Sequence, residues 1–346
     1  MNSFEVSRIA GVSRSTVSRV VNGYSNVPEG TRARVQAVID KYGYSPNNAA
    51  RNLAGKPSNV VGLFILDKGA DNRNIICSSP FYSMFMAHIA DKLQERGCHL
   101  LVSVVKSGEV MQAVKGIYTQ KIISGGIFMG EIVQDDVLQW LSANNHYAML
   151  VNQREKPDMP GIILLNTENY LGAYKAVEVL IRYGHRRIAH IVGSMEKASS
   201  KERFAGYRDS LGQGGLVFDE SIVVTANIHR EQSGYEAAKN LFLNIQGSIP
   251  TAVFCANDLT AFGTIRALSE LGYKVPKDVS VMGFDNVEAG KYIVPSLSTV
   301  ETSVEKLADL AASNLIGCIE TRTTEQSFIK LEEFSIIMRD SVADIT

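Results

Sequence analysis

Residues 10–23 read Ala-Gly-Val-Ser-Arg-Ser-Thr-Val-Ser-Arg-Val-Val-Asn-Gly, and the organisation of the whole chain can be worked out from them. Two short helices joined by a turn of three or four residues that contains glycine form a helix-turn-helix unit, and residues 11–13 have the composition of such a turn. Val17, Val20 and Val21 recur at i, i+3 and i+4 and predict an apolar stripe on the second helix. The final glycine of the stretch is expected to end that helix.

The opposite face of the second helix carries side chains that suit DNA. Arginine donates two hydrogen bonds to guanine O6 and N7, short hydroxyl and amide side chains reach phosphates or base edges, and this face has no acidic group to repel the DNA backbone. For an arginine and serine face considered alone, a solvated amphipathic helix without a ligand is the alternative. The residues of this face are Arg14, Ser15, Ser18, Arg19 and Asn22.

The same stretch, followed by Val-Pro-Glu-Gly-Thr-Arg at residues 27–32, resembles the headpiece of the lactose-repressor/galactose-repressor (LacI/GalR) family of bacterial transcription regulators. The resemblance implies a repressor that occupies near-palindromic, double-stranded operator DNA as a homodimer, because a two-fold dimer imposes its symmetry on the DNA. The tail after Asp340 has no leucine heptads, so a dimer rather than a tetramer is expected. Base reading in the major groove is assigned to Arg14, Ser15 and Arg19. Phosphate contacts are expected from Ser13, Thr16, Ser18, Asn22, Asn26 and Thr31.

Two further helices are expected to complete an all-α headpiece over residues 1–44. The first should begin near Asn2 and turn Val6, Ile9 and Ala10 toward the recognition helix. The third should run from about residue 31 to residue 41, where the following glycine stops it.

Residues 45–57 are the expected hinge helix and linker. A proline near the start and a glycine near the end bracket about two helical turns, which are too short to be stable alone in water. In the resembled family this segment folds on DNA, pairs with its twin and inserts a leucine into the minor groove, and here that leucine is Leu53. Such a wedge unstacks a base step, so a flexible operator centre is expected. A linker with an incidental leucine is the alternative.

Length and charge fit this division. A chain of 346 residues with 45% hydrophobic and 21% charged residues is expected to fold into two or three soluble domains. Residues 1–56 hold eight Lys or Arg against three Asp or Glu, a net charge of +5, and the whole chain carries −1, so residues 57–346 carry −6. The basic end is where a phosphate backbone would be met.

The cysteines and the N-terminus point to the cytoplasm. Cys77, Cys98, Cys255 and Cys318 match neither a metal site nor a Cys-x-x-Cys motif, which predicts a reduced setting with no metal and no other cofactor. We also expect no membrane association, because the sequence has no basic-then-apolar signal segment and no run of about eighteen apolar residues.

From residue 58 onward, apolar runs alternate with helical patterns. Residues 60–66, Val-Val-Gly-Leu-Phe-Ile-Leu, are typical of a strand buried on both faces. A helix from Met84 to Arg96 should follow, and the cycle recurs to about residue 283. Repeated β-α units imply an α/β body of parallel sheets covered by helices, with too many strands for one small sheet.

The family resemblance extends over this body. It implies an effector-binding domain over residues 58–346 of periplasmic-binding-protein type, with two flavodoxin-like lobes and a small, sugar-like ligand between them. The motifs that carry it include Gly-His-Arg-Arg-Ile-Ala-His-Ile at residues 184–191, Ala-Asn-Asp at 256–258 and Gly-Phe-Asp-Asn at 283–286. The N-lobe is expected over about 58–165 and 294–325, and the C-lobe over about 166–293 and 326–346.

Several polar residues directly follow predicted strands, where parallel α/β sheets bind their ligands. A polyol needs convergent donors and acceptors and an aromatic wall, because every hydroxyl that loses water needs a new partner. By their place in the family motifs, Arg203, Asn257 and Asp285 are expected to hold ligand hydroxyls or a carboxylate. The further effector-site candidates are Phe81 and Tyr82 as a stacking wall, Asn152 at a strand end, and Lys197, Ser199 and His229 in loops.

Each candidate has a structural alternative. Asn257 and Asp285 would alternatively cap the helices that follow them. Arg203 would form an exposed ion pair, and Phe81 would belong to the core. For the three loop residues a surface role is the alternative. A positive Lys197 with a functional role would favour an acidic or phosphorylated ligand.

An enzyme is not expected. The sequence has no G-x-S-x-G elbow, Walker A loop, H-E-x-x-H pair or G-x-G-x-x-G fingerprint. His185 and His190 suit neither a zinc pair nor a catalytic triad. The alternatives to a sugar-responsive regulator are a regulator that responds to a nucleobase or nucleoside, and a plain binding module without regulatory DNA binding. A periplasmic carrier would require a signal peptide, and an architectural DNA binder would leave the α/β body unexplained.

Overall fold

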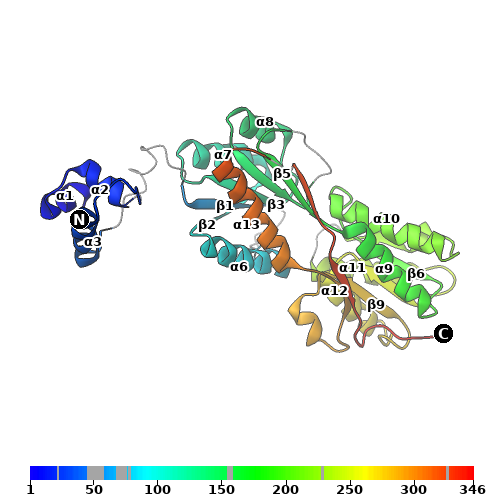
Figure 1. The fold of residues 1–346 in the computed structure, drawn as a ribbon. Coiled ribbons are helices and arrows are strands. Elements are labelled where there is room, and N and C mark those ends of the chain that lie inside the picture. Colours follow the sequence, from blue (N-terminus) through cyan, green and yellow to red (C-terminus); the bar gives the residue numbers. More distant parts are fainter. Residues whose placement is uncertain are drawn as a thin grey trace. The chain divides into compact units, whose positions relative to one another are not determined.

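In the computed structural model the chain divides into two compact units, Met1–Ser58 and Asn59–Thr346 (Figure 1). The structure describes residues 1–21, 23–44, 58–67, 76, 79–153, 159–226, 230–324 and 327–346. Asn22, Leu53 and His229, three of the predicted functional residues, lie outside the described residues. None of the described helices has the length and apolarity needed to cross a membrane.

The described part of the first unit is a headpiece with the helices α1 (Ser3–Ala10), α2 (Arg14–Val21) and α3 (Glu29–Tyr42). Asn2 caps α1 by accepting hydrogen bonds from two backbone amides of its first turn. Ser13 caps α2, because its Oγ accepts a hydrogen bond from the Thr16 amide at 3.1 Å. Gly11 provides the left-handed turn between the two helices with φ 65°.

A small apolar core holds these helices together. Val6, Val17, Val20 and Val35 are buried, so the predicted valine stripe of α2 faces inward. Ile9 is 45% exposed, and the expectation that it would face the recognition helix is wrong. Its neighbours at positions 6 and 10 are one turn apart and share the inward face, whereas position 9 falls to the side of that face.

The second unit contains two six-stranded sheets, each built largely from parallel strands. The first sheet belongs to the N-lobe and has the order β11-β5-β4-β3-β1-β2, with all neighbouring pairs parallel. Helices α6 and α13 cover one face, and α7 and α8 cover the other (Figure 1). The N-lobe elements are β1 (Val60–Asp67), α6 (Pro80–Glu95), β2 (His99–Lys106), α7 (Val110–Thr119), β3 (Gly125–Gly130), α8 (Asp135–Ala143), β4 (Tyr147–Val151), β5 (Ile162–Thr167), α13 (Val304–Thr321) and β11 (Phe328–Leu331).

The second sheet belongs to the C-lobe and has the order β12-β10-β9-β8-β6-β7. Only β12 runs antiparallel to its neighbour among the described strands of this sheet. Helices α9 and α10 pack on one face, and α11 and α12 pack on the other. The C-lobe elements are α9 (Asn169–Arg182), β6 (Ile188–Val192), α10 (Ala198–Gln213), β7 (Val223–Thr225), α11 (Glu231–Asn244), β8 (Ala252–Cys255), α12 (Asp258–Glu270), β9 (Ser280–Phe284), β10 (Ser298–Thr302) and β12 (Phe334–Ile337).

The chain crosses between the lobes three times. The first crossing, between β5 and α9, lies at Glu168, close to the expected position. The other two lie after β10 and after β11, whereas the sequence placed them near residues 294 and 325. The physical reason is strand pairing, because residues 298–300 pair with β9 of the C-lobe and residues 328–331 pair with β5 of the N-lobe.

Candidate functional site

The recognition helix α2 presents a polar, basic face. Burial of Val17 and Val20 fixes its orientation within the headpiece, and this leaves Arg14, Ser15 and Arg19 exposed. The guanidinium of Arg14 lies 3.5 Å from the hydroxyl of Ser3. Of the remaining DNA-contact candidates, Ser13, Ser18 and Asn26 are exposed, and Thr16 and Thr31 are partly exposed.

Three hydroxyl groups gather at the N-terminus of α2. Ser13 Oγ lies 2.7 Å from Ser15 Oγ and 2.9 Å from Thr16 Oγ1. Hydroxyl groups and unpaired backbone amides at the start of a helix are suited to a phosphate oxygen, because both donate hydrogen bonds toward a negative charge.

In the C-lobe, the sheet and α10 bring Arg203 to Asp285. Arg203 Nη2 lies 3.4 Å from Asp285 Oδ1, Nη1 donates to the carbonyl of Ala256 at 2.5 Å, and Nε donates to Asn169 Oδ1 at 3.0 Å. The guanidinium also lies 3.6 Å from the ring centroid of Phe284. The exposed fractions of the Arg203 and Asp285 side chains are 11% and 12%. The alternative of an exposed ion pair for Arg203 therefore does not hold.

Asp285 follows β9 in a left-handed backbone conformation with φ 112°. Burial raises the pKa of its carboxyl to about 6, although the charge of Arg203 and its hydrogen bond lower it. Asp285 makes its described side-chain contact with Arg203 rather than with the start of the next helical turn, so capping does not explain it.

Asn257 is the N-cap of α12. Its Oδ1 accepts a hydrogen bond from the Thr260 amide at 2.9 Å, which is the structural alternative foreseen for this residue. The preceding residue, Ala256, supplies the carbonyl that binds Arg203. The end of β8 therefore both caps a helix and orients the arginine.

Lys197 stands at the start of α10, after β6, and pairs with a residue of the other lobe. Its Nζ lies 3.6 Å from Oε1 of Glu131, which follows β3, and each of these side chains is 20% exposed. Ser199 lies partly buried in the first turn of α10. The ion pair joins the carboxyl-end edges of the two sheets.

The N-lobe candidates form two separate contacts. Asn152 follows β4 with φ 53°, and its Oδ1 accepts hydrogen bonds from the amide and the hydroxyl of Thr167 at the end of β5. Phe81 and Tyr82 lie in the first turn of α6, with ring centroids 5.9 Å apart and an edge-to-face arrangement. Both are partly buried against the N-lobe core.

Four residues of these contacts were not predicted as site residues. Asn169 and Phe284 bind Arg203, Thr167 binds Asn152, and Glu131 binds Lys197. Phe284 lies inside the Gly-Phe-Asp-Asn motif at residues 283–286, so its place in the chain was a signal that the sequence offered. Glu131 had none, since it follows a strand without forming part of a motif.

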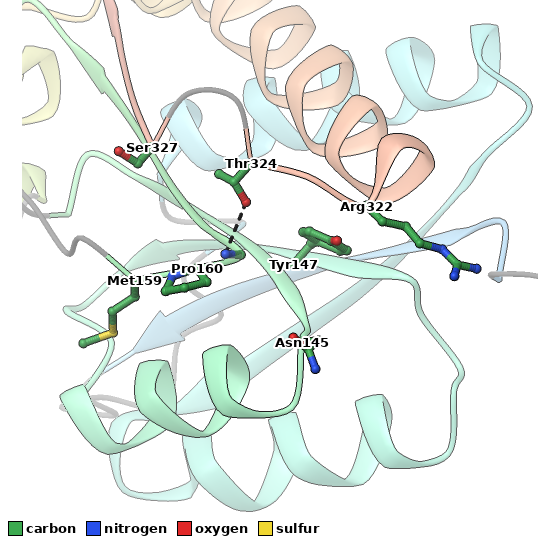
Figure 2. A pocket seen from close by; sticks show the side chains of 8 residues that line it. Asn145, Tyr147, Met159, Pro160, Arg322, Thr324 and Ser327 are labelled. Carbon is green, nitrogen blue, oxygen red and sulfur yellow. Dashed lines mark hydrogen bonds between the residues drawn. The ribbon is translucent and has the colours of Figure 1, made fainter.

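A pocket of ≈ 400 Å³ lies elsewhere in the N-lobe (Figure 2). Tyr147 begins β4 and Gly161 precedes β5, so this pocket is at the amino ends of the strands, opposite the edge where parallel sheets bind ligands. The amide of Gly161 donates to Thr324 Oγ1 at 3.2 Å, and Arg322 extends away from the other lining side chains. The pocket is lined by Asn145, Tyr147, Met159, Pro160, Gly161, Arg322, Thr324 and Ser327, none of which is an effector-site candidate.

Metal chemistry has no evident site in the described part of the chain. Among those residues, no group of three or more His, Cys, Asp or Glu side chains could hold a metal ion.

Comparison with known proteins agrees with the order of the two units. The sequence pattern described as "Bacterial regulatory proteins, lacI family" matches residues 4–47, and the pattern described as "Periplasmic binding protein-like domain" matches residues 177–342. The first covers the headpiece, and the second covers most of the C-lobe and the returning N-lobe segments.

Relatives and solved structures match over almost the whole chain. The HTH-type transcriptional repressor PurR of Erwinia tasmaniensis is 32% identical over 343 residues, which cover 98% of this chain and 96% of the relative. A structure of the lac repressor dimer bound to operator and the anti-inducer ONPF matches with a TM-score of 0.84 at 26% identity, over 99% of each chain. A complex of the transcriptional regulator CelR with cellobiose matches with a TM-score of 0.73 at 27% identity, again over 99% of each chain. The chain belongs to the LacI family of bacterial regulatory proteins and is a DNA-binding transcription regulator.

Proposed function

We propose that this protein is a repressor that binds a near-palindromic operator as a homodimer and is controlled by a small, sugar-like effector held by the α/β body. The observation that carries the effector part is the cluster of Arg203 with Asp285, Asn169 and the Ala256 carbonyl at the carboxyl ends of the C-lobe strands. Its functional units are the headpiece (1–44), the hinge and linker (45–57) and the effector-binding domain (58–346). The protein acts in the cytoplasm and does not chemically alter its effector.

On the DNA side, Arg14, Ser15 and Arg19 read bases in the major groove, with Leu53 as a wedge in the minor groove. Exposure of the arginines on the face opposite the valine stripe supports this assignment. Residues with hydroxyl or amide side chains contact the DNA phosphates, and these are Ser13, Thr16, Ser18, Asn22, Asn26 and Thr31.

On the effector side, a neutral polyol fits the described charges better than an acidic ligand. Arg203 is matched by Asp285 and Lys197 is matched by Glu131, so neither cation is left to balance an anion. The solved CelR complex contains a neutral sugar, cellobiose. Asp285 and Asn257 are proposed to bind ligand hydroxyls, with Phe81 and Tyr82 as an aromatic wall and Asn152, Lys197, Ser199 and His229 as further contacts.

A nucleobase or nucleoside is the second candidate effector, favoured by the 32% identity to PurR. A purine needs an aromatic face for stacking. The guanidinium of Arg203 already covers the Phe284 ring, so the stacking partner would have to be Phe81 or Tyr82.

The test is operator selection from random DNA with the purified chain, repeated with sugars, sugar acids and nucleosides at a stated salt concentration. A palindromic site whose binding is weakened or strengthened by one neutral sugar supports the proposal. A response to a nucleoside alone selects the second candidate, and no preference over random DNA refutes the regulatory role.

Asp285→Asn tests the effector assignment. The amide keeps the size of the side chain and removes the charge that faces Arg203, so operator binding should survive while the response to the effector weakens by about tenfold or more. Asp340→Asn, on an exposed carboxylate that bonds Ser296, is the matched control and should respond normally. A normal response in Asp285→Asn rejects this residue as a ligand contact.

A further inference from the structure

Asp258, the first residue of α12, is a buried carboxylate to which the proposed function gives no role. Its exposed fraction is 0%. Its Oδ2 accepts a hydrogen bond from the Val287 amide at 2.8 Å, and its Oδ1 accepts one from the Thr299 hydroxyl at 2.6 Å. The backbone amide of Phe284 also bonds to it. One side chain therefore joins α12, the end of β9, the following loop and β10.

The loop that Asp258 holds is conformationally demanding. Asp285 has φ 112° and Asn286 has φ 50°, and side chains other than glycine adopt this region only where the surroundings enforce it. The approach of Asp258 is close, since a Cβ on Gly283 would lie 2.2 Å from Asp258 Oδ1. Glycine at 283 is thus required by this contact.

A second set of polar contacts fixes the neighbouring residue of the same loop. The Asn286 amide donates to Thr299 Oγ1 at 3.3 Å, and the Asn286 side chain accepts from Arg339 at 2.6 Å and donates to Glu301 at 3.1 Å. Thr299 therefore links the carboxylate of Asp258 to the loop backbone by a second route.

The two segments joined by Asp258 are the two that bind Arg203. One is the end of β8, where the Ala256 carbonyl accepts from Nη1 of Arg203. The other is the loop after β9, where Asp285 faces Nη2. Asp258 follows the first segment by two residues along the chain and bonds directly to the second.

We propose that Asp258 is a positioning residue that holds the loop 285–287, with Asp285 and Asn286 in their left-handed conformations, so that Asp285 faces Arg203 and the effector. This inference rests on the proposed role of Asp285 in effector binding. Burial and the nearby Asp285 raise the pKa of Asp258 to about 8, although the hydrogen bonds from the Thr299 hydroxyl and the two backbone amides lower it.

The test compares Asp258→Ala, Asp258→Asn and Thr264→Val in the full chain. Asparagine can still accept from the Val287 amide and donate to Thr299, so it should rescue the loop. Thr264 is buried on the same helix and bonds to the Thr260 carbonyl rather than to the loop, which makes its valine variant the control for loss of a buried polar group.

The readout is hydrogen exchange resolved to single amides, with no DNA or effector present. The informative amides are those of Asp285 and Asn286, because they bond to the Val300 carbonyl and to Thr299 rather than to Asp258. In Asp258→Ala their exchange should accelerate by about tenfold more than that of the β8 amides, while the other two variants stay at the wild-type rate.

Unchanged exchange at Asp285 and Asn286 in Asp258→Ala overturns the proposal. Equal acceleration throughout the C-lobe strands also overturns it, since that indicates a general loss of stability. If the alanine variant does not fold, Thr299→Val replaces it, because it removes the hydroxyl that bonds to Asp258. Only the Asp285 amide is then informative, since the Asn286 amide bonds to Thr299 itself, and unchanged exchange at Asp285 has the same meaning. If the operator and effector screen refutes the proposed function, these exchange rates are unaffected. Failure of the proposed function and failure of the inference about Asp258 can therefore be told apart.

If the operator and effector screen identifies a compound that changes operator binding, that compound provides a second, functional readout. That compound should be needed at about tenfold higher concentration with Asp258→Ala, while operator affinity without it stays at the wild-type level. Thr264→Val should respond as the wild type does.

Discussion

At the scale of single residues, burial has its clearest effect on the protonation of His190 on β6. It has no exposed surface, its Nδ1 lies 2.8 Å from the Phe254 carbonyl, and its Nε2 has no hydrogen-bond partner among the described residues. The rings of Tyr207 and Phe254 lie within 5 Å of it, at centroid distances of 4.7 and 4.9 Å. Burial lowers the pKa of this imidazole to about 4, and the charge of Arg203 acts in the same direction.

Stability should therefore fall as the pH falls from about 6.5 to about 4. In that range the unfolded chain binds a proton at His190 and the folded chain does not. The contribution is about 2 kcal/mol between pH 7 and pH 5. Urea unfolding at the two pH values should show a smaller difference for His190→Asn, which keeps a donor for Phe254. An identical pH dependence in the variant would contradict the assignment.

Arg14 makes a prediction about specificity. Arg14→Ala should lose about 1–3 kcal/mol of operator affinity, confined to one base pair of each half-site, because a bidentate arginine contact discriminates one base. Binding to the selected operator and its single-base variants measures the effect. Arg34→Ala, exposed on α3, is the control and should change affinity equally for all sequences or not at all. A uniform loss for Arg14→Ala would make it a phosphate contact.

The candidate site was predictable from sequence only in part, and particular residues show why. Arg203 and Asp285 stood in recognisable motifs, and they do meet. Their partners Asn169 and Phe284, and the pairing of Lys197 with Glu131, depend on which strands become neighbours in space, which local sequence does not encode. His229 and Leu53 stay predictions, since they lie outside the described residues.

At the scale of elements, two C-lobe helices approach each other at glycine. A Cβ on Gly263 of α12 would lie 2.0 Å from the Glu231 carbonyl oxygen and 2.4 Å from the Tyr235 amide nitrogen of α11. A Cβ on Gly234 of α11 would in turn lie 2.3 Å from the Thr260 carbonyl oxygen. The obstacles are backbone atoms, so rotation of a side chain cannot relieve them.

Gly263→Ala should therefore lower the free energy of unfolding by about 1–3 kcal/mol through overpacking. Gly317→Ala in α13 is the matched control, because among the described residues no atom outside its chain neighbours and the nearby helix backbone lies within 4 Å of the added Cβ. Alanine also favours a helix over glycine by about 0.5–1 kcal/mol. Urea midpoints should thus move in opposite directions. Equal shifts would mean that the α11–α12 contact adjusts freely.

The elements themselves were largely predictable, whereas their assignment to lobes was not. The valine spacing in α2 and the apolar run of β1 are local signals, and the helix and the strand that they predicted are both present. The second crossing was placed too early because the Pro-Ser-Leu-Ser motif at residues 295–298 leads into a strand, and only its pairing with β9 shows that this strand belongs to the C-lobe.

At the scale of the whole molecule, the proposed dimer constrains operator geometry. Half-sites read by two linked headpieces must lie on the same side of the duplex, one helical turn of about 10 base pairs or a multiple apart. Inserting about five base pairs between the half-sites should move binding toward the non-specific level, typically a thousandfold weaker. Insertion of a full turn is the control. Indifference to a five-base-pair insertion, measured by fluorescence anisotropy, would show that the headpieces bind independently.

The three crossings also determine which parts of the protein can fold while the chain is still being synthesised. The headpiece, complete by residue 42, leaves the ribosome first, and domains generally fold as they emerge. The N-lobe sheet lacks its covering helix α13 and its edge strand β11 until residue 331 has been translated. A nascent chain therefore carries a folded headpiece on an unfinished effector-binding domain for most of its synthesis, and the N-lobe can close its sheet only near the end of translation.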